Sequence, residues 1–315
     1  MNTAPVVAHE IADAFLHEPD GLAATQALLV MAGGEVVLER YGAGVTPHTT
    51  LVSWSMAKSV TQALVGLLVA DGRLDIDAPV PVPAWAGDER RTITMAHLLH
   101  MRSGLRFRED YGDQQSDVVE MLFGAGRGDV AGFAAAMPLV HPPGSHWEYA
   151  SGTTNIICRI AGDLVGGGPD GMRAYVQERL FGPLGMTSAT MRFDEAGTFI
   201  GSSFLYATAL DYARFGELYR LGGCWDGVRI LPEGWTELAR TATPTPESEA
   251  YGYAGHWWLW PYPGSFAAHG YEGQHIVVVP DRQLVVVRLA TTPDAHKWWP
   301  RALLHRLIET FPVSG

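Results

Sequence analysis

The stretch SMAKSVTQALVGLLVADGRLD, residues 55–75, contains a lysine inside a segment that is otherwise suited to burial. Its apolar residues recur at helical spacing, and further apolar residues fill the opposite side, a pattern typical of a helix that is buried all round. Gly72, directly after Asp71, predicts the end of this helix. Lys58 therefore falls in the first turn of a buried helix, where an apolar residue would be expected.

Lysine is a rare residue in this chain. Of the 22 lysines and arginines among 315 residues, only Lys58 and Lys297 are lysines, so lysine is not the routine surface charge. Ser55 precedes Lys58 by three positions, which places both side chains on one face of the predicted helix.

A serine hydroxyl becomes a strong nucleophile only when a base removes its proton, and an amine is such a base only when neutral. Near pH 7 this requires the lysine pKa to fall by about three units, equivalent to about 4 kcal/mol. Burial of the amine and the positive end of the helix both lower that pKa. We therefore predict Ser55 as a nucleophile and Lys58 as its base.

Two further segments carry candidate site residues. Tyr149 lies between a loop rich in proline and glycine and a helix-like run, and a phenol can relay a proton between a lysine and a serine or leaving group. On its own, such a tyrosine is more often a packed aromatic residue. At AAHGYEGQ, residues 267–274, a strand reaches Gly270, which lets another backbone approach closely. The N–H of the residue next to Gly270 would then join the N–H of Ser55 in an oxyanion hole.

Strand-like segments lie near both ends of the chain, and helix-like segments lie between them. Residues 27–42 predict a hairpin around Gly33 and Gly34, and residues 274–290 predict a second hairpin turning at PDRQ. The fold class that follows is α/β (α+β), with one antiparallel sheet flanked by helices. We assign residues 1–78 and 243–315 to this sheet domain and residues 79–242 to a mainly helical domain.

These segments together resemble the serine β-lactamase-like family, in its class C and esterase branch, over nearly the whole chain. They are most similar to amide hydrolases of the 6-aminohexanoate-dimer hydrolase type and to related esterases. The resemblance rests on Ser55-Met56-Ala57-Lys58, on MRSGLRFREDYGDQQSD at 101–117, on Tyr149-Ala150-Ser151 and on Gly270-Tyr271-Glu272-Gly273-Gln274. It implies an α/β sandwich domain and a helical domain with the active site between them.

The resemblance also implies roles for individual residues. Ser55 would be acylated, and Lys58 and Tyr149 would share the general-base and general-acid work. The backbone N–H groups of Ser55 and Tyr271 would form the oxyanion hole.

Four more residues match the family at substrate-binding positions. Tyr111 aligns with a tyrosine that contacts the substrate in the dimer hydrolases, and Ser151 occupies the usual place of an asparagine. The family's third motif often begins with a lysine or histidine and ends in a glycine, which aligns with Gly270 here. Ala268 takes the position of the lysine or histidine, and His269 lies between the two. Because that cation helps to hold a substrate carboxylate in penicillin-binding relatives, its absence argues against β-lactam and D-Ala-D-Ala substrates.

Composition narrows the range of partners. A net charge of −12 argues against binding to nucleic acid and to anionic membranes. No apolar run is long enough to span a membrane, and the N-terminus lacks the pattern of a signal peptide, so we expect a cytoplasmic protein. The sequence has no HExxH motif, and we expect neither a metal nor a cofactor.

The function that fits these features best is hydrolysis of a small ester or amide through a covalent acyl-enzyme. One alternative is β-lactamase or D-amino-acid peptidase-type activity on the same set of residues. Another is a catalytically silent binding protein with this fold. A monomer and a homodimer are equally compatible with the sequence.

Overall fold

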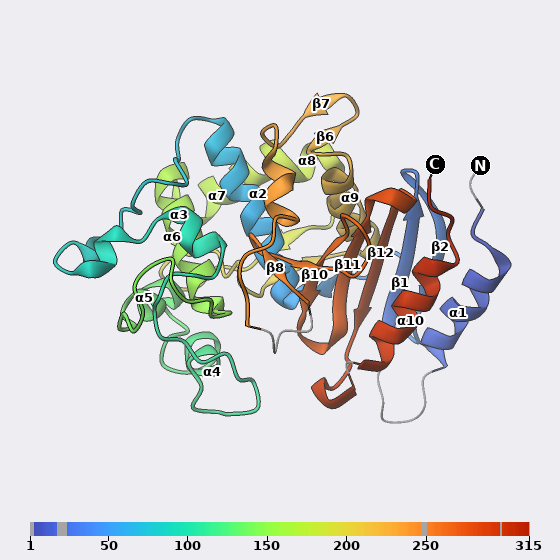
Figure 1. Ribbon diagram of the computed structural model, residues 1–315, viewed down its shortest axis with the longest axis horizontal. Coiled ribbons are helices and arrows are strands. Elements are labelled where there is room, and N and C mark those ends of the chain that lie inside the picture. Colours follow the sequence, from blue (N-terminus) through green and yellow to red (C-terminus); the bar gives the residue numbers. More distant parts are fainter. Residues whose placement is uncertain (1–2, 18–23, 247–250, 297, 315) are drawn as a thin grey trace.

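A seven-stranded antiparallel sheet forms one side of the molecule in the computed structural model, which describes residues 3–17, 24–246, 251–296 and 298–314 (Figure 1). The strand order is β2-β1-β12-β11-β10-β9-β8. The strands are β1 (Thr25–Ala32), β2 (Glu35–Tyr41), β8 (Tyr253–Ala254), β9 (Trp257–Leu259), β10 (Phe266–Gly270), β11 (Gln274–Val279) and β12 (Leu284–Ala290). The sheet is therefore built from both ends of the chain, as predicted.

Both predicted hairpins are confirmed. The turn between β1 and β2 uses Gly33 and Gly34 at φ values of 59° and 85°, a left-handed conformation that glycine adopts without steric cost. The turn between β11 and β12 ends at Gln283, which also has a positive φ of 51°. β1 then pairs with β12, which joins the N-terminal hairpin to the C-terminal one.

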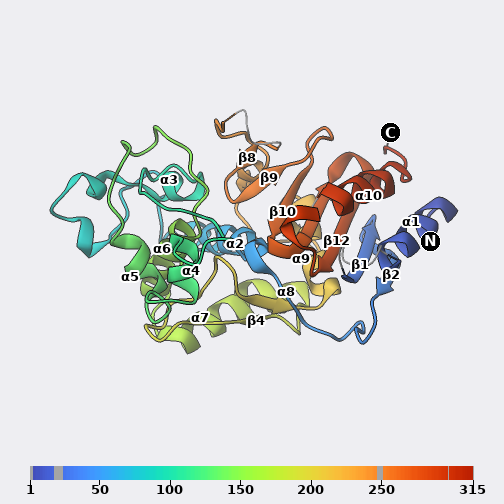
Figure 2. The same ribbon diagram turned by 90° about the horizontal axis from the view of Figure 1, so that it is seen from below.

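Helices cover both faces of the sheet. On one face, α1 (Val6–Leu16) and α10 (Trp298–Glu309) pack against strand residues that include Leu28, Val277 and Val286. On the other face, α9 (Ala209–Arg220) lies against β1, β11 and β12. Figure 2 shows α1 and α10 at the sheet end of the molecule and the helical region at the opposite end.

α2 (Ala57–Ala70) links the sheet to the helical region. A 3-10 turn at Trp54–Met56 leads directly into it, and its side chains are buried from Ala57 to Leu68. Gly72 has a φ of 66° just beyond the helix, which confirms the predicted end. α2 packs against α6 and also contacts β10, so its first turn lies where the two parts of the molecule meet.

The helical region is centred on α6, which contacts α2, α3, α5 and α7. Its helices are α3 (Met95–Leu99), α4 (Asp117–Leu122), α5 (Val130–Ala135), α6 (Ser151–Val165), α7 (Gly168–Val176) and α8 (Gly182–Leu184), with a π-helical turn at Gln177–Phe181. Short strands border it: β3 (Leu51–Val52), β4 (Thr190–Met191) and β5 (Leu205–Ala207) form a small sheet, and β6 (Cys224–Trp225) and β7 (Val228–Arg229) form a hairpin.

The segment 79–242 that the sequence assigns to a helical domain also contains α9, which packs on the sheet. The division of the chain at residues 78 and 243 stays a prediction. Within the described residues, no helix is both long and apolar enough to cross a membrane.

Candidate active site

The structure brings Ser55 and Lys58 into contact at the start of α2. Lys58 Nζ lies 2.9 Å from Ser55 Oγ, because three positions along a 3-10 turn and helix leave both side chains on the same side. Lys58 is only 1% exposed, and this burial lowers the pKa of its amine to about 8. At that pKa roughly a tenth of the amine is neutral at pH 7.

The remaining hydrogen bonds of Lys58 orient the lone pair of its neutral form. Nζ lies 2.9 Å from Ser151 Oγ and 3.0 Å from the backbone oxygen of Ser202. The Ser202 carbonyl can only accept, and Ser151 gives its single hydroxyl proton to the Glu109 carboxylate. Both groups therefore accept from Lys58. A neutral amine has two protons for them, and its lone pair is left facing Ser55 Oγ.

Glu109 is a site residue that the sequence analysis missed. Its carboxylate accepts hydrogen bonds from both the hydroxyl and the backbone N–H of Ser151, the latter at 2.7 Å. Burial raises the pKa of Glu109, while the charge of Lys58 and the hydrogen bonds from Ser151 act in the opposite direction. Glu109 lies within the segment 101–117 that carries the family resemblance, but its spacing from Ser151 gives no local signal that the two meet.

Tyr149 lies beside the lysine. The Lys58 amine is 4.9 Å from the centre of its ring, and the other side of the tyrosine packs on Tyr253 and Trp258. Burial raises the pKa of the Tyr149 phenol, and the charge of Glu109 raises it further, whereas the Ser55 hydroxyl lowers it. The phenol is therefore protonated near neutral pH and is suited to giving a proton.

Gly270 allows the end of β10 to pack closely against the segment that carries Ser55. A Cβ atom at this position would lie 2.4 Å from the backbone oxygen of Ser53, so only a glycine permits this approach. β10 runs alongside the turn at Trp54–Met56, and Tyr271 follows directly after the strand. This contact places the end of β10 beside the turn that contains Ser55. An oxyanion hole formed by the N–H groups of Ser55 and Tyr271 stays a prediction.

Tyr111 joins the same group of aromatic side chains. Its ring stacks on that of Tyr271 at 4.7 Å and meets Trp54 edge-on at 6.2 Å. Burial raises the pKa of the Tyr111 phenol, and the hydroxyls of Ser151 and Ser203 act in the opposite direction. Tyr111 thus lies between the Ser151 hydroxyl and the Tyr271 segment.

His269 points to a different place. Side chains alternate along β10, so Ala268 and Gly270 face α2 while His269 faces the opposite side. Its imidazole stacks on Trp258 and packs edge-on against Trp260 and His275. Trp258 also contacts Tyr149, so the Trp258 ring lies between His269 and the predicted catalytic residues. A substrate contact by His269 stays a prediction.

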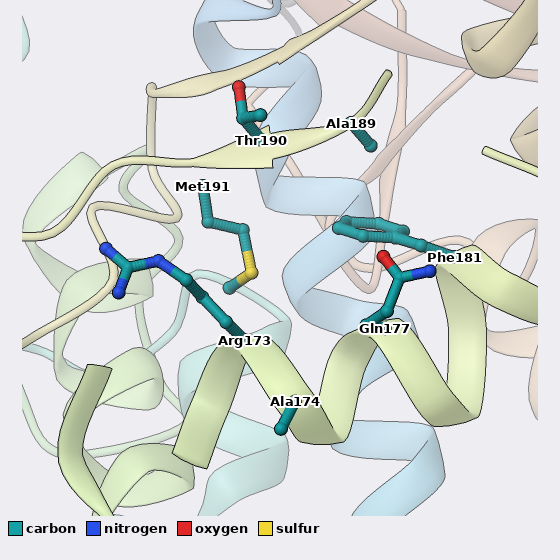
Figure 3. Close-up of a pocket in the computed structure, with 7 residues that line it drawn as sticks. All are labelled: Arg173, Ala174, Gln177, Phe181, Ala189, Thr190 and Met191. Atoms are coloured by element: carbon teal, nitrogen blue, oxygen red, sulfur yellow. The ribbon is translucent and has the colours of Figure 1, made fainter. Parts of the chain in front are cut away.

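A pocket of about 370 Å³ lies between α7, the π-helical turn and β4 (Figure 3). Arg173, Gln177 and Phe181 line it from one side and Ala189, Thr190 and Met191 from the other. The Arg173 guanidinium pairs with Asp170 and covers the ring of Phe193. None of the lining residues belongs to the predicted site.

A family model described as beta-lactamase matches residues 17–307, nearly the whole chain. The chain belongs to the β-lactamase family. The resemblance inferred from the motifs is therefore confirmed.

The chain is similar to one curated protein in sequence and to two solved structures in fold. The 6-aminohexanoate-dimer hydrolase of Paenarthrobacter ureafaciens is 28% identical over 290 residues, which cover 86% of this chain and 73% of that protein. A solved structure from Bacillus anthracis, described as a "putative 6-aminohexanoate-dimer hydrolase", has a TM-score of 0.78 at 22% identity, covering 98% of this chain and 83% of that one. A penicillin-binding protein homologue from Caulobacter crescentus has a TM-score of 0.70 at 18% identity, covering 98% of both chains. The two structures support the fold.

Proposed function

We propose that this protein is a serine hydrolase that cleaves a small ester or amide through a covalent acyl-enzyme on Ser55. The observation that carries the proposal is the buried Lys58 amine, whose other two hydrogen-bond partners leave its lone pair for Ser55 Oγ. Burial of an amine costs stability and lowers its pKa, and such shifted groups are typical of sites where a proton is transferred.

In acylation, neutral Lys58 takes the proton of Ser55 as Oγ attacks the substrate carbonyl carbon. The carbonyl π electrons move onto oxygen, where the N–H groups of Ser55 and Tyr271 stabilise the charge. The C–N or C–O bond then breaks, and Tyr149 gives its proton to the departing atom. The Lys58 ammonium, which faces the Tyr149 ring, returns a proton to the phenolate.

In deacylation, a water molecule takes the place of the leaving group. The same Lys58–Tyr149 pair removes its proton, the resulting tetrahedral intermediate collapses, and the acid product leaves with Ser55 protonated again. Because the two groups exchange protons, their titrations are coupled and the pH–rate profile describes the pair.

The substrate class follows from the leaving group that the site can protonate. Esters need less protonation of the leaving group than amides do, and we expect esters with short acyl chains to be cleaved most readily. Amides depend more strongly on the acid role of Tyr149. The named activity of the Paenarthrobacter relative supports an amide as a further substrate. Tyr111 and Ser151 are the residues we propose for contacting it.

β-Lactam or D-amino-acid peptide hydrolysis is the second candidate, and the family description favours it. Ala268 stands against it, because this small residue occupies the position where penicillin-binding relatives carry a cation. A cytoplasmic location and a monomeric or dimeric state stay predictions from the sequence.

A panel of p-nitrophenyl esters, p-nitroanilides and a chromogenic cephalosporin tests the proposal. We expect turnover of the esters, loss of turnover in Ser55→Ala with an unchanged far-ultraviolet circular dichroism spectrum, and addition of a fluorophosphonate to Ser55 by mass spectrometry. Labelling of another serine, or full activity in Ser55→Ala, would contradict the proposal. Turnover of the cephalosporin alone would favour the second candidate.

A further inference from the structure

Two residues directly beside the predicted oxyanion hole are joined by their side chains. Trp54 precedes Ser55, and Glu272 follows Tyr271. The indole Nε1–H of Trp54 donates a hydrogen bond of 2.9 Å to Glu272 Oε2, although 218 positions separate the two residues along the chain. Each member of this pair is thus a sequence neighbour of one of the two N–H donors.

Both residues have an unusual backbone conformation. Trp54 has a φ of 44° and Glu272 a φ of 60°, in the left-handed region that costs residues other than glycine about 1 kcal/mol or more. Such conformations persist where the surroundings hold them. Trp54 opens the 3-10 turn that contains Ser55 and leads into α2, and Glu272 lies in the turn that begins with Tyr271. The direction of both donors depends on these two turns.

The segment that carries Glu272 is firmly attached to the sheet. The backbone oxygen of Glu272 accepts the Thr292 N–H at 2.9 Å, and the oxygen of Tyr271 accepts from the Gln274 side chain at 3.1 Å. The rings of Trp54 and Tyr271 also meet edge-on at 5.5 Å. The side chain of Glu272 therefore extends from a fixed support to the residue before the nucleophile.

We propose that Glu272 is a positioning residue that holds Trp54, and with it the Ser55 N–H, at a set distance and angle from the Tyr271 N–H. The inference rests on the proposed function of Ser55. Two donors from distant segments stabilise an oxyanion only when both are in place before the charge develops. The hydrogen bond between Trp54 and Glu272 supplies this alignment, and the carboxylate takes no part in proton transfer.

The variants Glu272→Ala, Glu272→Gln and Trp54→Phe separate this role from others. Glutamine keeps an oxygen that accepts from the indole, alanine removes it, and phenylalanine removes the donor while keeping a ring. Because loss of a whole donor costs about 100-fold or more, loosening one should cost about tenfold in kcat. Glu89→Ala, at an exposed position in a 3-10 turn, is the matched control and should leave kcat unchanged.

We expect Glu272→Ala and Trp54→Phe each to lower kcat on a p-nitrophenyl ester about tenfold, with KM within twofold. The double variant should be no slower than either single variant, and Glu272→Gln should stay within threefold of the wild type. Affinity for a trifluoromethyl ketone, whose adduct with Ser55 carries an oxyanion, should weaken in parallel with kcat. Thermal melting of each variant shows whether a loss of kcat reflects unfolding.

Several results would overturn the inference: full kcat in Glu272→Ala, additive losses in the double variant, or an equal loss in Glu272→Gln and Glu272→Ala. The last result would make Glu272 important for its charge. If Trp54→Phe fails to fold, the comparison of the two Glu272 variants decides alone. An inactive wild type that does not react with a fluorophosphonate at Ser55 would instead refute the proposed function, so the two failures are distinguishable.

Discussion

Replacing Glu109 with glutamine should move the acid side of the pH–rate profile to lower pH. The Glu109 carboxylate reaches Lys58 through one hydroxyl, that of Ser151, and its negative charge raises the pKa of the amine while burial lowers it to about 8. Removing this charge takes away the largest charge interaction that favours the ammonium form, while burial continues to disfavour it. The amine then loses its proton at a lower pH, and the activity that requires neutral Lys58 appears earlier as pH rises.

The size of the effect follows from the geometry. Two consecutive hydrogen bonds place the carboxylate roughly 4 to 5 Å from the amine. At an effective dielectric constant of about 20 to 40, a pair of unit charges at that distance interacts by about 2 to 4 kcal/mol, or roughly one to three pKa units. The rate at the high-pH plateau should fall at the same time. Glutamine has an NH₂ group in place of one carboxylate oxygen, and this group cannot accept the Ser151 hydroxyl proton. Released from Glu109, that hydroxyl can compete with Ser55 for the lone pair of Lys58.

The assay is kcat/KM for a p-nitrophenyl ester between pH 5 and pH 10, with the enzyme's stability checked at each end. The matched control is Asp113→Asn, which removes an exposed carboxylate of the same loop that pairs with Arg108. The control should leave the acid limb in place. An unchanged limb in Glu109→Gln, or a shift to higher pH, would refute the electrostatic coupling between Glu109 and Lys58.

Three further predictions test other parts of the site. Gly270→Ala should lower kcat by about 100-fold or more, because the new Cβ would lie 2.4 Å from the Ser53 oxygen and displace the oxyanion-hole backbone; ester turnover with normal kcat would show that the segments move apart without cost. Tyr149→Phe should slow p-nitroanilide cleavage at least tenfold more than p-nitrophenyl ester cleavage, since p-nitrophenolate leaves without a proton; equal losses in the two assays would remove the acid role. Burial lowers the pKa of His256 to about 3, so the unfolded chain binds a proton below pH 6.5 that the folded protein does not. His256 alone should therefore contribute a loss of about 1.6 kcal/mol between pH 6.5 and pH 5, and in urea unfolding His256→Asn should lose about that much less than the wild type over this range; a pH dependence unchanged by the substitution would contradict this.

The sequence predicted what depends on local spacing. The three-residue separation of Ser55 and Lys58 sufficed to place both side chains together, and the apolar pattern of residues 55–75 sufficed to predict a buried helix that ends before Gly72. Glycine pairs and a proline-containing turn identified both hairpins. Each of these features is decided within a few residues, where steric limits on φ and hydrophobic periodicity act directly.

The features that the sequence did not disclose depend on contacts between distant segments. The hydrogen-bond partners of Lys58 besides Ser55 lie 93 and 144 positions away along the chain. One of them is a backbone oxygen, and because every residue has one, the sequence cannot indicate which one Lys58 contacts. Glu109 becomes important only because the fold brings it to Ser151. The sequence placed His269 next to Gly270, but it did not show that the alternation of the strand turns its side chain toward the other face. Likewise, the sequence assigned the residues of α9 to the helical domain without showing that this helix packs on the sheet.

The central claim is that Lys58 loses its proton near neutral pH, and the scarcity of lysine makes this directly measurable. With only Lys58 and Lys297 in the chain, selective ¹³C and ¹⁵N labelling gives two lysine side-chain signals in NMR spectra. A Lys58→Met variant assigns them, because one of the two signals disappears. We predict that this signal titrates with a midpoint near pH 8 in the wild type. A midpoint near 10.5, the ordinary value for an exposed amine, would contradict the account.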